Sequence, residues 1–144
     1  MKKFVFTLLL VFVCHLGYAQ GINGLFNEFG SEKNADCVKV SSFMMSLGKM
    51  FAGHDEDAKI IRKIKSIKVL DLESCTASVK ERFNKKVNKL NLKGYDELMR
   101  VNDEGEKVRV LMKTKKEAIR ELLFVCTGKE DCTLVQINGK FTKD

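Results

Sequence analysis

The sequence predicts an α+β fold, with helices packed on a largely antiparallel sheet that ends in a C-terminal strand meander. Residues 94–141 support this prediction, because apolar and polar side chains alternate there with the period of a strand. Upstream of them, apolar residues recur at helical spacing in several segments. Helices first and a strand meander last indicate a layer of helices on one face of the sheet.

The N-terminus has the pattern of a signal peptide. Lysines at the start precede a run of apolar residues from 4 to 13, and small residues stand before Gln20. We therefore expect residues 1–19 to be a signal peptide and residues 20–144 to form a single α+β domain. That length is enough for one hydrophobic core without support from a metal ion.

Two kinds of membrane attachment compete with this interpretation. A transmembrane anchor needs about 20 apolar residues, which is more than the run provides. A lipid anchor on Cys14 would need small residues before it, where Phe12 and Val13 stand, and it stays open as an alternative. We expect an exported chain that is periplasmic, outer-membrane-associated or secreted, with no transmembrane segment after cleavage.

The expected domain begins with a helix and a short strand. Four apolar residues at helical spacing predict one buried stripe: Ile22, Leu25, Phe26 and Phe29. The helix should stop near Gly30 and lie on the sheet. After a polar loop, residues 37–40 have the alternation of a strand.

A second helix is expected after Ser41 and Ser42, which can cap it. Methionines and other apolar residues share one face of it: Phe43, Met44, Leu47, Met50 and Phe51. Such a face suits an adaptable binding surface, but at helical spacing it is more typical of a core. His54 follows beside three acidic residues, and because consecutive side chains diverge, we expect residues 54–57 to be a solvated loop and not a metal site.

Residues 58–92 should form a short helix, a strand and a longer helix. The short helix is predicted by isoleucines at helical spacing: Ile60, Ile61 and Ile64. Residues 67–72 then alternate as a strand. Ser78 and Glu81 have the spacing of a capping box, so a helix should begin there and run to about Leu92. Its buried stripe would contain Val79, Phe83, Val87 and Leu90.

The remaining residues predict two hairpins. In the first, residues 98–101 and 108–112 alternate on either side of a turn at 102–105. In the second, the loop would be residues 127–131. The strands beside that loop would then pair Cys126 with Cys132, Phe124 with Leu134, and Leu123 with Val135.

Four cysteines follow the expected signal peptide: Cys37, Cys75, Cys126 and Cys132. An even number of cysteines in an exported chain favours disulfides. The hairpin register makes a bond between Cys126 and Cys132 the most plausible one, with Cys37 and Cys75 as the second pair. The alternative is that all four are buried thiols that pack as small apolar residues.

The second hairpin has apolar residues on both faces at its centre. Phe124 and Leu134 would point one way, and the opposite face would carry Leu123, Val125, Val135 and Ile137. Either a helix crosses to that second face or another molecule covers it. We therefore interpret these four residues as a face through which the chain forms a homodimer.

Positive charge is concentrated in residues 59–93, which contain eleven basic and three acidic residues. The chain as a whole has a formal net charge of +7. The helix in this region would present four cations that could bind an anionic glycan or lipid: Arg82, Lys85, Lys86 and Lys89. The alternative is a solvated face of an amphipathic helix. We expect no nucleic-acid binding, because the one aromatic residue there, Phe83, is assigned to the core and lysines outnumber arginines.

Catalytic motifs are missing from the sequence. No G-x-S-x-G elbow, no Walker motif and no G-x-G-x-x-G fingerprint occurs, and no pattern of metal ligands has the usual spacing. We therefore expect no catalytic residues, no metal and no cofactor. The competing interpretation is a hydrolase-type enzyme that uses carboxylates or a thiol, since any fold can bring two acids together.

Several strings resemble the family catalogued as domain of unknown function 4252. They are CVKVSSFMMSL, KIKSIKVLDL, YDELMRVNDEGEKVRVLMK, IRELLFVC and LVQINGKF, and the resemblance spans residues 25–141. The resemblance implies a small exported protein of a Gram-negative bacterium, found mainly in Bacteroidetes, with a mixed α+β domain. It implies no catalytic residues. Many relatives are lipoproteins or have few cysteines, and the four cysteines here depart from that pattern.

Together these observations predict an exported protein of the cell envelope that acts as a non-catalytic binding or assembly module. A binder of anionic glycan or lipid, and an enzyme, are the two alternatives. A flat apolar sheet face would favour the first interpretation, and a deep pocket with perturbed acids would favour the enzyme.

Overall fold

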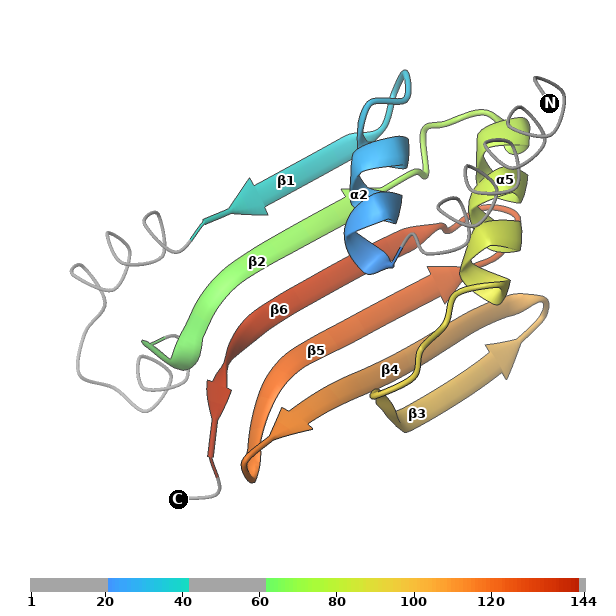
Figure 1. Ribbon diagram of the computed structural model, residues 1–144. Coiled ribbons are helices and arrows are strands. Elements are labelled where there is room, and N and C mark those ends of the chain that lie inside the picture. Colours follow the sequence, from blue (N-terminus) through green and yellow to red (C-terminus); the bar gives the residue numbers. More distant parts are fainter. Residues whose placement is uncertain (1–20, 42–61, 143–144) are drawn as a thin grey trace, which may run out of the picture.

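The computed structural model describes residues 21–41 and 62–142 (Figure 1). In these residues the chain forms two helices and one six-stranded sheet. The elements along the chain are α2 (Ile22–Gly30), β1 (Asp36–Val40), β2 (Ile64–Asp71), α5 (Ala77–Asn88), β3 (Asp96–Asp103), β4 (Glu106–Lys115), β5 (Ala118–Thr127) and β6 (Thr133–Phe141). The predicted α+β class and the C-terminal strand meander are confirmed.

The strands lie in the order β1-β2-β6-β5-β4-β3, and every neighbouring pair is antiparallel. Strands β3 to β6 form the meander, joined by short connections. The last strand, β6, lies between β5 and β2, so it joins the meander to the β1–β2 pair. Both helices lie on the same face of the sheet (Figure 1).

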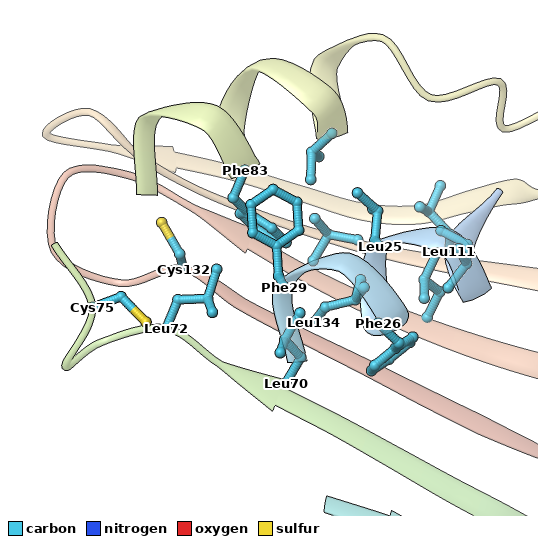
Figure 2. Packing of buried hydrophobic residues seen from close by; sticks show 14 residues of the cluster. Leu25, Phe26, Phe29, Leu70, Leu72, Cys75, Phe83, Leu111, Cys132 and Leu134 are labelled. Carbon is cyan, nitrogen blue, oxygen red and sulfur yellow. The ribbon is translucent and has the colours of Figure 1, made fainter. Parts of the chain in front are cut away.

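The hydrophobic core lies between the two helices and this face. Helix α2 buries the predicted stripe of Ile22, Leu25, Phe26 and Phe29, and α5 buries Phe83 and Val87. The rings of Phe29 and Phe83 meet edge to face with their centroids 5.4 Å apart (Figure 2). The sheet contributes inward-facing residues from its central strands: Leu70, Leu111, Leu123, Val125 and Leu134.

Two predicted element boundaries are wrong. Helix α5 begins at Ala77, because the hydroxyl of Thr76 accepts a hydrogen bond from the backbone N–H of Val79 at 3.3 Å and caps the helix. The capping box expected at Ser78 is therefore not the start of the helix. Ile64, expected in a helix, lies in β2 opposite Gly139, since β6 supplies a pairing partner there. The rest of that expected helix and the helix and charged loop expected at 43–57 lie outside the described residues.

The register predicted for the last hairpin is wrong by one residue. Cys126 lies opposite Thr133, not Cys132, and Phe124 lies opposite Val135. The physical reason is that β6 pairs on both sides, and Leu134 fits the core between Leu70 of β2 and Val125 of β5. Because side chains alternate with a period of two, this shift places every residue of β6 on the face opposite to the one predicted from its pairing.

We expect the Phe83→Ala variant to lose about 3–5 kcal/mol of unfolding free energy, because the ring is fully buried and its removal leaves a cavity against Phe29. Urea unfolding followed by circular dichroism measures this loss. Lys85→Ala on the same helix is the matched control, since the side chain of Lys85 is 71% exposed. Equal stabilities of the two variants would contradict the core described above.

Candidate interaction face

The face of the sheet that points away from the helices carries an unbroken row of apolar residues. Residues paired directly across antiparallel strands point to the same face. The observed registers connect one such row through all six strands, in the order Val38, Val69, Val135, Phe124, Val110 and Met99. We call the face that contains this row the open face, because neither described helix lies on it (Figure 1).

A second row runs beside the first and is apolar on five strands. It contains Val40, Ile67, Ile137, Leu122 and Met112, and it ends at Asp96 on β3. A third row, on the other side, contains Asp36 and Asp71 on β1 and β2 and becomes apolar at Val108 and Val101. The apolar centre of the open face is therefore continuous, and carboxylates lie at its margin.

Several of these side chains are exposed to a degree that is unusual for apolar residues. Val38 is 56% exposed, Met99 49%, Val101 45% and Phe124 37%. They extend from one edge of the sheet to the other and are joined by half-buried apolar residues and by Val110, which is buried. A contiguous apolar surface of this kind marks a site of interaction, whereas isolated exposed apolar residues need no explanation.

The four residues predicted for a dimer face lie on two different faces of the sheet. Val135 and Ile137 belong to the open face. Leu123 and Val125 face the helices instead and are only 0% and 2% exposed. The cause is the register error in the last hairpin, since a shift of one residue exchanges the two faces.

Most residues of the open face were not predicted from the sequence. The residues not predicted are Val38, Val69, Val110, Met99 and Phe124. Each lies in a strand that has apolar residues among the side chains of both faces. That signal predicts that both faces are apolar, but it does not reveal which residues share a face across strands.

The predicted anion-binding cations serve in part to join the two helices. Lys86 binds the carboxylate of Glu28 at 2.5 Å, and Arg82 pairs with Glu32 and lies 3.8 Å from Glu28. Arg82 also lies over the ring of Phe29. Lys85 is 3.6 Å from Glu81 on its own helix, and Lys89 is exposed. Half of the expected cationic face is therefore paired with carboxylates of α2 and of the loop that follows it.

A buried polar cluster lies on the helix side of the sheet. The hydroxyl of Tyr95 donates to Oε1 of Glu121 at 2.7 Å, and Nε2 of Gln136 donates to the same oxygen at 2.5 Å. Glu121 is 8% exposed and Gln136 6% exposed. The cluster holds one carboxylate, whereas glycosidase-type acid–base chemistry uses two. Across residues 21–41 and 62–142, no group of three or more acidic, histidine or cysteine side chains could hold a metal ion.

All four thiols are unbonded in the structure. The thiol of Cys132 donates to the carbonyl of Gly128 at 3.3 Å on the helix side, whereas that of Cys126 lies 3.9 Å from the carbonyl of Asp131. The predicted bond between them is absent because they are not paired across the hairpin. Cys75 donates to the carbonyl of Lys33 at 3.5 Å, and Cys37 packs at the margin of the core.

The environment of three of the thiols favours their protonated form. Burial is the main cause that raises the pKa of Cys75, Cys126 and Cys132, and nearby carboxylates add to it. A nucleophilic cysteine needs the opposite shift. His54, the predicted loop histidine, lies outside the described residues, so the structure assigns no base to any of these thiols.

Tyr95 should titrate above the ordinary range. Burial raises the pKa of its phenol, and the hydrogen bond to the Glu121 carboxylate raises it further. Since the folded state binds this proton more tightly, the contribution of Tyr95 to stability is full below about pH 10 and is lost as the pH rises further. Phenolate absorbance measures the titration, and Tyr18, the other tyrosine, lies in the predicted signal peptide.

Glu121→Gln is the matched control for this titration. It retains an oxygen that accepts from Tyr95 but removes the charge, so the midpoint should move back toward the ordinary value. A native midpoint at or below about 10 would contradict the buried cluster.

Comparison with protein-family models assigns the chain to a family. Residues 29–144 match the family model described as Domain of unknown function (DUF4252). No curated protein and no solved structure matches the chain. No helix in the described part of the chain is long and apolar enough to cross a membrane. The family match covers most of the sequence, including every strand of the sheet and most of its core, and the chain therefore belongs to the DUF4252 family.

Proposed function

We propose that this protein is a non-catalytic binding or assembly module of the bacterial cell envelope, and that it acts through the open face. The observation that supports this function is the apolar row from Val38 to Met99, which crosses all six strands. Water in contact with so much apolar surface is unfavourable, and removal of this surface from water on binding provides the driving force for association.

The chemistry of the remaining groups favours a binding module over an enzyme. The thiols whose pKa is raised are poor nucleophiles at neutral pH. The buried carboxylate of Glu121 already accepts two hydrogen bonds from protein groups. An enzyme would need a nucleophile or an acid–base pair aimed at a substrate, and the described residues supply neither arrangement.

The N-terminal pattern supports a location outside the cytoplasm. Lys2 and Lys3 precede an apolar run that ends before small residues, as in exported proteins. The assignment to the cell envelope therefore belongs to this proposal and depends on cleavage before Gln20.

Binding of anionic glycan or lipid by α5 is less well supported. Arg82 and Lys86 are paired with acids of α2 and of the loop after it, so a ligand would have to compete with Glu28 and Glu32. Lys85 and Lys89 are two exposed cations with little geometric constraint, and such surface charges by themselves give weak and salt-sensitive binding.

Site-specific photo-crosslinking in intact producing cells tests the proposed function. We expect benzoylphenylalanine in place of Met99 or Phe124 to give adducts of discrete mass, because these side chains would lie against the partner. The same residue in place of Lys85, on the opposite side of the molecule, should give none. Absence of adducts at both open-face positions, or the same adducts from position 85, would contradict the proposal.

A further inference from the structure

The charged residues at the two ends of the strands differ in sign. One end contains mainly carboxylates, on the strand ends and on the loops that join them: Asp36, Asp71, Asp103, Glu106, Glu130 and Asp131. The other end is mainly cationic, at the beginning of β2, the β4–β5 turn and the end of β6: Lys63, Lys65, Lys115, Lys116, Arg120 and Lys140. The apolar rows of the open face lie between these acidic and basic ends.

We infer that the partner of the open face is a second copy of this chain, packed sheet against sheet about a two-fold axis that runs across the strands. The inference rests on the proposed function and names its partner. Rotation about this axis lays the strands of the two copies antiparallel, so the acidic end of each sheet lies over the basic end of the other. A two-fold axis along the strands would instead place acid over acid, which is unfavourable.

The apolar rows suit such self-association because they are self-complementary. In an isologous interface the same patch meets itself, so a patch with charge at its centre would bury like charges against each other. The first row has no charged residue, the second has Asp96 only at the sheet edge, and the third has its carboxylates, Asp36 and Asp71, at the acidic end of β1 and β2. Two sheets packed in this way interleave their apolar side chains about 10 Å apart, as in a β-sandwich.

The size of the patch is sufficient for a dimer. Six strands spaced by about 4.8 Å span about 29 Å, and three rows of side chains span about 17 Å along the strands. The patch thus measures roughly 500 Å² on each copy in projection. Two copies bury about 1,000 Å², which reaches the lower bound for a specific interface.

Phe124 provides the sharpest test, because it lies near the middle of the first row. Any two-fold axis through the centre of the patch brings the two copies of this residue close together. We expect the purified chain to sediment with the mass of a dimer at micromolar concentration. Phe124→Asp and Phe124→Lys should each halve that mass, because either charge would be buried against itself.

Mixing the two variants should restore the dimer, since the aspartate of one chain then meets the lysine of the other. This outcome separates loss of association from loss of folding, and native circular dichroism of each variant checks the fold. Met99→Asp, at an exposed edge position, is a second variant that should weaken the dimer without disturbing the core. Lys85→Asp, on the helix side, should leave the dimer intact.

The orientation has its own test. Lys65→Glu should weaken the dimer, and adding Asp36→Lys should restore it, because the acidic end of one copy lies over the basic end of the other. Added salt should also weaken the wild-type dimer, since it screens the attraction between the charges at the margin. A Lys65→Glu variant as tight as the wild type would overturn this orientation.

The outcomes distinguish failure of this inference from failure of the proposed function. A monomeric wild type whose Phe124 position still crosslinks to proteins of other mass would overturn the second copy as partner and leave the binding function standing. A monomer with no crosslinks overturns both. A monomer in which benzoylphenylalanine at position 124 crosslinks only within its own chain, to residues 42–61, would assign the cover of the open face to that segment and overturn both.

Discussion

The structure depends on the pairing of β6 on both of its edges. Leu134 lies opposite Leu70 of β2 on one side and Val125 of β5 on the other, and all three side chains are buried against the helices. This pairing joins the antiparallel pair of β1 and β2 to the meander in one sheet. It also decides which residues of each neighbouring strand face the helices, because a change of one residue in register would exchange the two faces.

The open face follows from the same constraint. Once Leu134, Val125 and Leu70 are committed to the core, their neighbours in the strands must point away from the helices, and these neighbours are Val135, Phe124 and Val69. Sheets with one solvated face usually place polar residues there. The central rows of this sheet are apolar instead, and the charged residues of its strands lie at the strand ends or, like Lys68 and Arg109, on the helix side. An apolar centre with a charged margin is the composition that the proposed interface requires.

Local patterns predicted much of this fold and little of the candidate site. The buried stripe of α2 and the strand meander could be predicted because each depends on the spacing of residues within one segment. The family could be predicted because the match extends over most of the chain. The register of the last hairpin could not be predicted, because strands with apolar residues in both phases fit either register. Arg82 and Glu32 are 50 residues apart in the sequence. No local pattern therefore showed that this predicted ligand-binding cation is paired with a carboxylate in the loop after α2.

The position of the last strand at the middle of the sheet has a consequence for how the molecule is made. Strands β1 and β2 have no other strand to join the meander until residues 133–141 have been synthesised, and contacts so distant in sequence form late. The two halves of the sheet therefore cannot close prematurely around an incomplete polypeptide. Such a delay is compatible with secretion through a narrow channel, where a threaded chain must stay open until its C-terminus has emerged.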